Sequence, residues 1–308
     1  MNNINVSLIC TLKNEEFSIR EFLDSLLSQS KPPDEIIIVD GGSTDGTVDI
    51  IRSYIEEGAP IKLIIKNGAN IAQGRNIAIE NAKYDIIAST DAGCRIDKDW
   101  LKNLIKPFEA DLDVDVVSGW YEADAKTNFQ RCVAELTYPK LTHVINNAEK
   151  FLPSSRSVAY KKGCWEKVGG YPEWLYTAED TLFDLNLKKI GCTFVFAKDA
   201  VVYWKVRSNL KNVFKQHYSY AKGNGMANLS LPILLYLRYS VGILLVALSL
   251  IYPSILIFLV LALVLYIMMN IKINIDTVKL KKVPIYTLLI FSRDMAIICG
   301  YTVGMIHR

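Results

Sequence analysis

The sequence predicts an α/β protein with a doubly wound, mostly parallel sheet, followed by C-terminal transmembrane helices. Short apolar stretches alternate with helical patterns through roughly the first 120 residues. Two of these stretches end in acidic, glycine-containing turns, and residues 239–271 carry no charge. Alternating strands and helices are typical of a parallel sheet with helices on both faces, whereas a long uncharged stretch indicates passage through a membrane.

The elements of the sheet domain are expected in a definite order. Strands are predicted at Val6–Thr11, Glu35–Asp40, Lys62–Lys66, Asp85–Thr90 and Val114–Gly119, and helices at Glu15–Gln29, Thr47–Ile55 and Ile71–Ala82. Later strands are predicted at Val158–Lys161, Thr193–Ala197 and Val201–Trp204, and a helix at Glu179–Ile190. An amphipathic basic link follows, and we expect residues 1–230 to form one domain.

The uncharged stretch predicts a helical hairpin. A single helix over residues 239–271 would be about 50 Å long, whereas the hydrocarbon core of a bilayer is about 30 Å thick. Pro253 divides the stretch, so helices are expected at about Ile233–Ile251 and Ser254–Ile271. Arg238 is near the start of the first helix, and we expect its charge to reach back to the membrane interface.

A third apolar stretch is found at Val283–Ile306. It carries Arg293 and Asp294 near its middle, and because such a pair is costly in lipid, it is expected to face protein or water. The alternative is that this stretch lies in the membrane interface instead of spanning. Together with the hairpin it makes residues 231–308 the predicted transmembrane region.

The distribution of charge indicates the side of the membrane on which the domain lies. Residues 200–275 contain Lys and Arg but no acidic residue, and Lys279, Lys281 and Lys282 follow the hairpin. Basic residues at both ends place the ends of the hairpin in the cytoplasm. The chain opens directly with a predicted strand, so we expect no secretory signal, and a multi-pass protein of the cell membrane with a cytoplasmic domain.

Composition argues against other classes of protein. The net charge of +3 is too small to indicate nucleic-acid binding. The six cysteines show no Cys-x-x-Cys spacing, so the sequence suggests neither a zinc site nor a disulfide framework. The basic segment beside the apolar stretch instead suits an anionic membrane surface, so membrane lipids are expected partners.

Three acidic sites predict the chemistry. Asp40 and Asp91 each stand where a predicted buried strand ends, and Glu179-Asp180 comes later in the chain. Ligands of open α/β sheets bind at the carboxyl ends of the strands. Together with the apolar C-terminal region, these sites suggest a sugar-nucleotide enzyme at a membrane.

On these residues the chain resembles the family 2 inverting glycosyltransferases, which have the GT-A fold and often a C-terminal membrane anchor. The resemblance covers roughly residues 4–225 and rests on the order and spacing of several motifs. The segment Ser7–Glu15 resembles the opening strand and Asn-Glu loop of the family, which implies that Thr11, Asn14 and Glu15 contact the base and ribose of the donor. Taken alone, the segment is more typical of a strand followed by a helix start, with Asn14 as the cap.

Two further motifs complete the implied donor site. Asp40 matches the first of two adjacent Asp residues that grip the base in the family, and Gly41 stands in the second place. Arg75, within Gly74-Arg75-Asn76, matches a basic residue that meets the nucleotide. A plain turn and an exposed arginine in a first helical turn are the alternative interpretations.

The metal motif of the family is incomplete in this chain. Asp91-Ala92-Gly93 stands where the family carries Asp-x-Asp, which binds the metal that bridges the two phosphates. The resemblance implies that Asp91 binds the ribose, a Mg²⁺ or Mn²⁺ ion, or both, and water and phosphate would supply the other ligands of the metal. The alternative is that basic side chains neutralise the leaving diphosphate, with Arg156 as the candidate.

The resemblance also implies the catalytic residues. Asp180 aligns with the catalytic base of the family, and Glu179 precedes it in the Glu-Asp pair. Acids in the first turn of a helix also stabilise that helix, and the two roles are compatible. Gln216 and Tyr220 match a membrane-proximal segment that closes over the donor, and Trp204 takes a place often held by His, with sugar stacking or simple packing as its expected roles.

The resemblance implies a membrane-bound enzyme that transfers a sugar, with inversion, from a nucleoside diphosphate to a hydroxyl group, in glycan or polysaccharide assembly. A lipid-linked saccharide is the expected acceptor. One alternative is a polyprenyl-phosphate sugar synthase, since a phosphate acceptor needs no base. Another is a non-catalytic membrane protein that binds nucleotide sugar. The incomplete motif at Asp91 supports this last alternative, whereas Asp180 speaks against it.

Overall fold

The structure is a computed structural model, and it describes residues 4–271 and 282–308. The chain divides into two compact units. The first unit comprises Met1–Asp124 and Pro139–Lys205, and the second unit comprises Ala125–Tyr138 and Val206–Arg308. This boundary differs from the predicted one at residue 230, because helix α9 (Leu210–Met226) packs against helix α12 (Val283–Ile306) within the second unit.

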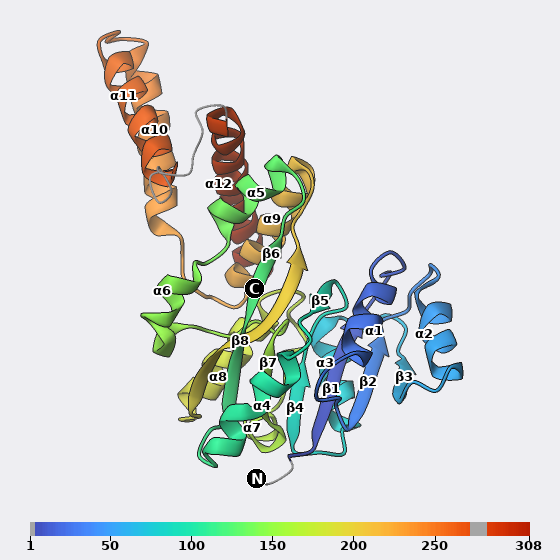
Figure 1. Ribbon diagram of the computed structural model, residues 1–308. Helices are drawn as coiled ribbons and strands as arrows, with labels where there is room; N and C mark the ends of the chain where they lie inside the picture. The colour runs from blue at the N-terminus through green and yellow to red at the C-terminus, as the bar shows by residue number, and fades with distance from the viewer. Residues whose placement is uncertain (1–3, 272–281) are drawn as a thin grey trace. The chain divides into compact units, whose positions relative to one another are not determined.

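The first unit is built on one sheet, which has eight strands in the described part of the chain (Figure 1). The strands are β1 (Val6–Leu12), β2 (Glu35–Asp40), β3 (Ile61–Ile65), β4 (Ile86–Ser89), β5 (Cys94–Ile96), β6 (Val116–Asp124), β7 (Val158–Lys161) and β8 (Phe194–Lys205). They lie in the order β3-β2-β1-β4-β7-β6-β8-β5.

The direction of the strands changes along this sheet. β1 runs parallel to β2 and β4, and β2 runs parallel to β3. β7 is antiparallel to both of its neighbours, β4 and β6, whereas β6 is parallel to β8 and β5 is antiparallel to β8. The expected mostly parallel sheet is therefore found for β1 to β4, and the later strands make the whole sheet mixed. Strand β5 was not predicted, and the two strands predicted within residues 193–204 form the single strand β8.

Helices cover both faces of the sheet (Figure 1). They are α1 (Ile19–Leu27), α2 (Thr47–Glu56), α3 (Ile71–Glu80), α4 (Trp100–Ala110), α6 (Leu141–Ile145), α7 (Lys162–Lys167) and α8 (Glu179–Lys189), with a short 3₁₀ helix at Ala148–Lys150. Leu8 of β1 belongs to a core shared with Phe22 of α1. The next residue, Ile9, belongs to a second core shared with Phe183 of α8. Since successive residues of a strand point to opposite faces, the two cores lie on opposite sides of the sheet, as a doubly wound fold requires.

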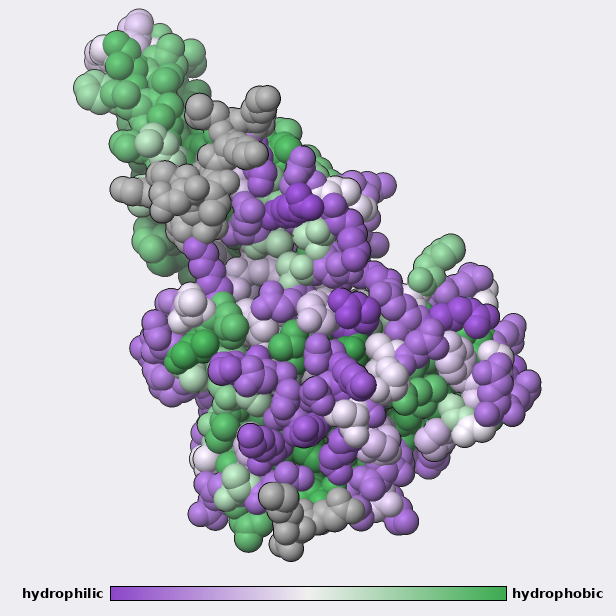
Figure 2. All heavy atoms as spheres, viewed as in Figure 1, coloured by the Kyte–Doolittle hydropathy of each residue, from purple (hydrophilic) through white to green (hydrophobic). Residues whose placement is uncertain are grey.

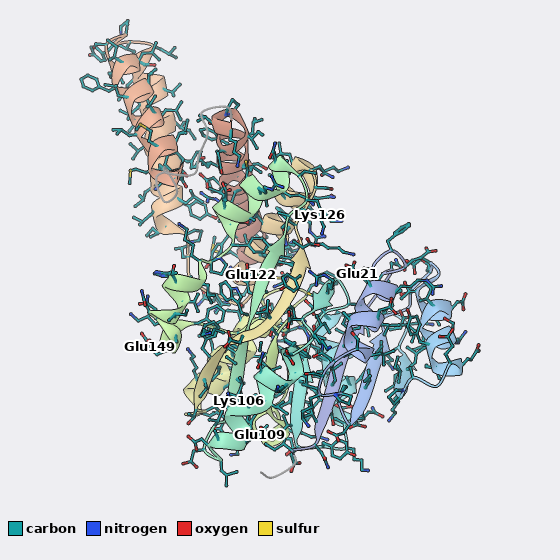
Figure 3. All side chains as sticks on the ribbon, viewed as in Figure 1. Glu21, Lys106, Glu109, Glu122, Lys126 and Glu149 are labelled. Carbon is teal, nitrogen blue, oxygen red and sulfur yellow. The ribbon has the colours of Figure 1, made fainter. Side chains whose placement is uncertain are left out.

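Helix α4 shows how the sequence produces this packing. Trp100, Leu104 and Phe108 are buried, whereas Lys106 and Glu109 are exposed (Figure 3). Apolar residues three or four positions apart form one stripe along a helix. The helix therefore turns this stripe towards the core and its charged residues towards water.

A buried serine joins α4 to the sheet. The indole N–H of Trp100 donates a hydrogen bond to Ser157 Oγ at 2.8 Å, and this hydroxyl donates to the carbonyl of Ala200 at 3.0 Å. A Cβ atom at Gly119 would lie 2.7 Å from the same carbonyl oxygen. Glycine is therefore required where β6 passes β8, and Ser157 supplies the acceptor for the buried Trp100 N–H and a donor to the Ala200 carbonyl.

The second unit is helical. It contains α5 (Asn128–Thr137), α9, α10 (Ile233–Ser249), α11 (Ile255–Ile271) and α12. In the contact between α9 and α12, a Cβ atom added at Gly300 would collide with the carbonyl of Tyr218, and one at Gly304 with the carbonyl of Lys222. These two glycines are four residues apart and share one helix face, so they let the two backbones approach each other closely.

Helices α10 and α11 stand on either side of Pro253, as the sequence predicts. Each has 17 residues, and no described side chain of α10 is buried. Figure 2 shows a strongly hydrophobic surface over both helices. By length and composition, α12, with 24 residues, is the one described helix that could cross a membrane. Residues 279–281 of the predicted basic loop lie outside the described residues.

We predict that Ser157→Ala lowers the free energy of unfolding by about 1–3 kcal/mol, because it leaves the Trp100 N–H buried without its acceptor and removes the hydrogen bond to the Ala200 carbonyl. Denaturant unfolding of the full-length protein in detergent, followed by tryptophan fluorescence, measures this loss. Ser53→Ala is the matched control, since Ser53 is partly exposed and bonds only to the Ile50 carbonyl one turn earlier. Equal losses in the two variants would contradict the prediction.

Candidate active site

The two acidic turns lie on the same edge of the sheet. β1 pairs in parallel with β2, with Leu12 opposite Asp40, and on its other side with β4, with Ile9 opposite Ser89. Asp91 follows the end of β4 by two residues. Because neighbouring strands are about 4.8 Å apart, the ends of β2 and β4 are separated by roughly 10 Å. One nucleotide can span this distance.

The loops after β1 and β2 are tied together by hydrogen bonds. Asn14 has a left-handed backbone with a φ of 57°. Its N–H donates to Ser43 Oγ at 2.8 Å, and its Oδ1 accepts from the N–H of Thr44 at 2.8 Å. The N–H of Glu15 donates to Thr47 Oγ1 at 2.8 Å. Asn14 and Glu15 therefore form one surface with the acidic turn after Asp40.

The carboxylate of Asp40 is directed into its own turn. Asp40 is fully buried, and its Oδ1 accepts hydrogen bonds from the N–H groups of Gly42 at 3.0 Å and Ser43 at 2.9 Å. The Ser43 hydroxyl donates to Oδ2. Gly42 supplies the positive φ of 88° that this turn requires. In this structure Asp40 thus shapes the loop, and its predicted contact with the donor stays a prediction.

A buried arginine brings the later motifs to this edge. Arg75 lies in the first turns of α3, which begins with a capping box between Asn70 and Gln73. A Cβ atom at Gly74 would lie 2.9 Å from the Cβ of Thr11, so the lack of a side chain there lets α3 pack against the end of β1. This close packing places Arg75 next to the strand ends.

Arg75 links two acids that are far apart in the sequence. The residue is 4% exposed. Its Nη1 donates to Glu179 Oε1 at 2.6 Å and its Nη2 donates to Asp91 Oδ1 at 3.2 Å. The guanidinium also lies over the ring of Tyr171, 5.4 Å from its centroid. One buried cation therefore joins the end of β4 to the start of α8.

Burial and charge act in opposite directions on this pair. Burial disfavours the charge of Arg75, but Glu179 and Asp91 outweigh that effect and raise its pKa. Burial raises the pKa of Glu179, although the facing Arg75 opposes the shift. Glu179 thus serves as the partner of Arg75, which leaves the neighbouring Asp180 as the carboxylate not spent on that arginine.

A second arginine approaches Asp91 from the other side. Arg156 Nε lies 3.7 Å from Asp91 Oδ2. Its guanidinium stacks over the ring of Trp204 at 3.6 Å from the centroid and lies 5.7 Å from that of Tyr121. The side chain of Asp91 is 31% exposed. Asp91 is therefore held between two arginines but stays open to a ligand.

The site fits a metal ion only in part. Asp91 is the one carboxylate of its turn, and a Cβ atom added at Gly93 would meet nothing within 4 Å. This open space surrounds the position where the family carries the second acid. A Mg²⁺ or Mn²⁺ ion is compatible with these residues if Asp91 supplies one oxygen and the diphosphate and water supply the others.

Asp180 lies in the first turn of α8, where the sequence places the base. The residue before the pair, Ala178, has a left-handed backbone with a φ of 65°. Asp180 is partly exposed, and its Oδ1 accepts from the N–H of Thr181 at 2.8 Å. Its carboxylate therefore remains accessible at the edge that holds Asp91 and Arg75.

The other acid of this helix is buried. Asp184 lies one turn after Asp180 and is 3% exposed, and its Oδ2 has no hydrogen-bond partner in the described part of the chain. Burial raises its pKa well above the ordinary value, and the negative charge of Asp180 adds to this shift. The sequence pattern did not reveal this residue, because an acid in a helix usually faces water.

Two aromatic residues of the site were also missed. Tyr121 and Tyr171 lie against the guanidinium groups of Arg156 and Arg75. Their positions follow from the pairing of β6 with β8 and from the chain reversal at residues 169–170, and neither leaves a motif in the sequence. Gln216 and Tyr220 belong to the second unit, where Gln216 Nε2 donates to the Tyr220 hydroxyl at 3.2 Å.

Two other features lie away from this edge. Asp115, Cys164 and Cys192 place possible ligand atoms within 4.8 Å of one another. Asp115 already binds Lys161 and the N–H of Thr193, and three ligands are one fewer than a structural zinc site needs. Their wide sequence spacing explains why no zinc motif was visible.

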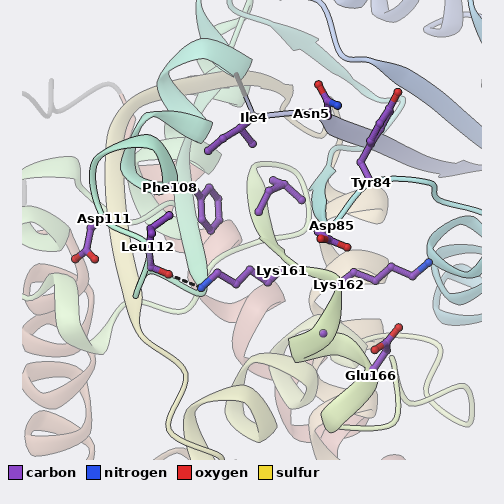
Figure 4. Close-up of a pocket in the computed structure, with 12 residues that line it drawn as sticks. Ile4, Asn5, Tyr84, Asp85, Phe108, Asp111, Leu112, Lys161, Lys162 and Glu166 are labelled. Carbon is purple, nitrogen blue, oxygen red and sulfur yellow. Dashed lines mark hydrogen bonds between the residues drawn. The ribbon is translucent and has the colours of Figure 1, made fainter. Parts of the chain in front are cut away.

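A cavity of about 650 Å³ lies at the opposite ends of the strands. It is bordered by Asn5 before β1, by Tyr84 and Asp85 before β4, by Lys161 at the end of the antiparallel β7, and by Lys162 directly after it (Figure 4). None of the predicted site residues lines it. This cavity therefore does not coincide with the predicted donor site at the edge of the acidic turns.

We predict that Asp184 makes the unfolding temperature pH-dependent. Since its pKa is raised in the folded state, the folded protein binds this proton more tightly than the unfolded chain. The resulting stabilisation is present at low pH and is lost as the pH rises above about 4 and the buried carboxyl ionises. Asp184→Asn should remove this loss and melt higher than the native protein at pH 8.

Thermal unfolding of the full-length protein in detergent between pH 4 and pH 8 tests the prediction. Asp113→Asn, at an exposed position, should keep the slope of the native protein. A parallel slope for the native protein and the Asp184→Asn variant would show that this carboxyl does not titrate with folding.

Comparison with known proteins identifies the family. The model of "Glycosyl transferase family 2" matches residues 7–165, just over half of the 308-residue chain. The poly-beta-1,6-N-acetyl-D-glucosamine synthase of Staphylococcus aureus is 23% identical over 223 residues, which are 71% of this chain and 54% of that protein. Glycosyltransferase AglE of Haloferax volcanii is 27% identical over 214 residues, 64% of this chain and 65% of the relative. The chain thus spans about half the length of the first of these curated relatives.

Two solved structures share the fold. The mannosyltransferase PcManGT from Pyrobaculum calidifontis, solved in complex with GDP-Man and Mn²⁺, matches with a TM-score of 0.66 and 19% identity, over 100% of this chain and 89% of that one. S. aureus TarS matches with a TM-score of 0.53 and 21% identity, over 74% of this chain and 40% of that one. The fold is thus that of the GT-A glycosyltransferases. With the family match over residues 7–165, the chain belongs to glycosyltransferase family 2.

Proposed function

We propose that this protein is a membrane-bound, inverting glycosyltransferase that moves a sugar from a nucleoside diphosphate to a hydroxyl group of a lipid-linked saccharide. The observation that carries the proposal is the bridge from Asp91 through Arg75 to Glu179. It sets Asp180, the next residue, at the edge of the sheet that carries the acidic turns. A donor phosphate and an acceptor hydroxyl can then meet between Asp91 and Asp180.

The donor is assigned to the loops after β1, β2 and β4. The surface formed by Asn14 and Glu15 with the turn after Asp40 would bind base and ribose. Arg156, beside Asp91, would contact the diphosphate. Negative charge builds up on this leaving group during transfer, and fixed cations in a partly buried site stabilise such charge effectively.

Asp180 is assigned as the general base. As the acceptor oxygen attacks the anomeric carbon, the C–O bond to the diphosphate breaks on the opposite face, and the acceptor proton passes to the Asp180 carboxylate. A single displacement of this kind inverts the anomeric centre. Glu179 cannot share the task easily, because its Oε1 is bonded to Arg75 and the residue is buried.

A divalent metal is part of the proposal. Arg75 and Arg156 face Asp91, Glu179 and Asp180, so two positive charges stand against three negative ones when all are ionised. This balance does not favour a diphosphate anion, and a bound Mg²⁺ or Mn²⁺ would reverse it. When bound at Asp91, the ion supplies charge stabilisation to the phosphates. The Mn²⁺ named with GDP-Man for the structural relative supports this assignment.

The membrane part is assigned to α10 and α11, with α12 as a third apolar helix. A helix of 17 residues is about 26 Å long, near the thickness of the hydrocarbon core. The exposed apolar side chains of both helices need a lipid environment. We place the ends of the hairpin and the first unit in the cytoplasm, where nucleotide sugars are made, and the acceptor enters from the membrane. Relatives named for polysaccharide synthesis support a glycan product.

We predict that Asp180→Asn lowers the rate of transfer to a hydroxyl acceptor by about 10²–10⁴-fold, because a positioned base contributes that much. Donor affinity should stay within a factor of about two, and the helix should lose only about 0.3–1 kcal/mol of stability. Asp199→Asn, at an exposed surface position, is the control and should transfer normally. Full activity of Asp180→Asn with a polyprenyl phosphate acceptor would favour the polyprenyl-phosphate synthase instead.

We predict that Gly93→Asp tightens Mn²⁺ binding in the presence of nucleoside diphosphate by about tenfold, roughly 1.4 kcal/mol. The new carboxylate enters open space and completes the Asp-x-Asp arrangement. Titration of Mn²⁺ followed by electron paramagnetic resonance, with UDP or GDP, measures the change. Gly163→Asp adds the same group at an equally open position and should leave Mn²⁺ affinity unchanged. No gain for Gly93→Asp would place the metal away from Asp91.

A further inference from the structure

The second unit contains a cavity whose walls are apolar but which holds two arginines. Its volume is about 840 Å³. Leu235 and Arg238 of α10, Leu265 and Met269 of α11, and Arg293 and Ile297 of α12 are among its lining residues. The cavity lies wholly within the second unit. None of the residues assigned to the donor lines it.

One acid of this cavity is already neutralised. Asp294 is 1% exposed, and its Oδ1 accepts from Arg293 Nη2 at 3.0 Å. Its Oδ2 accepts from the Tyr239 hydroxyl at 3.1 Å and also from the Tyr266 hydroxyl. Both carboxylate oxygens therefore have partners, and these partners weaken the repulsion between Asp294 and an incoming anion.

The second arginine is less constrained. Arg238 is exposed, and its guanidinium lies over the ring of Tyr266 at 4.3 Å from the centroid. Within residues 4–271 and 282–308, no carboxylate lies within ion-pair distance of it. His217 adds no charge. Its pKa is lowered to about 4, mainly by burial and also by the positive charge of Arg293. Among the described lining residues, two cations and one anion give a net charge of one positive unit.

The position of the cavity along the hairpin indicates its ligand. Arg238 lies in the second turn of α10, and Tyr266 and Asn270 lie in the last turns of α11. These are the ends of the hairpin and not its tip near Pro253. With these ends at the membrane surface, the arginines stand at the depth of lipid headgroups, and the apolar walls extend towards the acyl chains.

We propose that this cavity binds the phosphate group of the lipid-linked acceptor, with Arg238 as the main contact and Arg293 behind it. A guanidinium matches phosphate oxygens with paired N–H donors, and the apolar walls suit the lipid chain next to that phosphate. The inference rests on the proposed function for the identity of the acceptor. It adds that the protein binds this acceptor through its phosphate group.

Binding of a labelled polyprenyl phosphate to the full-length protein in phosphatidylcholine nanodiscs tests the site. We expect Arg238→Gln to weaken binding by at least about tenfold, the size of one lost charge-assisted hydrogen bond. Arg131→Gln removes the same charge from an exposed position of the same unit, on α5, and should bind as the native protein does. Equal affinities of the native protein and Arg238→Gln would overturn the proposal.

Further arms separate the possible ligands and the two proposals. Unlabelled phosphatidylglycerol that competes as well as unlabelled polyprenyl phosphate would show a general phospholipid site and overturn the assignment. Arg293→Gln with Asp294→Asn removes the buried pair together, so it tests Arg293 without leaving Asp294 unpaired, and weaker binding supports the site. Failure of the proposed function would instead appear as no sugar transfer from any nucleotide sugar, while polyprenyl phosphate still bound in an Arg238-dependent way.

Discussion

The buried guanidinium of Arg75 is the interaction on which the candidate active site depends. It contacts Asp91 after β4 and Glu179 at the start of α8, and it has almost no access to water. A buried charge of this kind is stable only while its partners remain, because removing one partner leaves the other uncompensated. The positions of the donor turn and of the base helix are therefore coupled. A change at Arg75 should disturb both ends of the reaction at once.

The rest of the first unit supports this contact. Parallel pairing of β1 with β2 and β4 brings three loops to one edge, and Gly74 lets α3 approach Thr11 closely enough to deliver Arg75. Arg156 then holds the other oxygen of Asp91, and the ring of Trp204 supports Arg156. The cavity of the second unit also combines arginines with an acid. There positive charge is in excess, because Arg238 and Arg293 outnumber Asp294. We infer that one unit tends to attract a cation with its diphosphate and the other an anionic lipid.

Patterns among neighbouring residues predicted the strands, turns and helices whose formation depends on residues close together in the chain. The strands β1, β2 and β4, their acidic turns and the two helices beside Pro253 are all confirmed. The antiparallel β7 and the single long β8 depend on pairing between distant segments, which apolar periodicity does not encode. For the same reason the sequence predicts Arg75 and Glu179 as site residues but not the contact between them, since they are 104 residues apart. The sequence predicts that Asp40 contacts the donor, yet in the structure its carboxylate accepts hydrogen bonds from the N–H groups of its own turn.

The most direct measurement of the central claim is a double-mutant cycle on kcat/KM for sugar transfer, with Arg75→Gln, Glu179→Gln and the double variant. If Arg75 acts by joining the donor turn to the base helix, each single change should remove most of the activity. The double variant should then lose little more, which gives a coupling energy above about 1 kcal/mol. Strictly additive losses would show that the two residues act independently. They would contradict the claim that the contact between Arg75 and Glu179 couples the donor turn to the base helix.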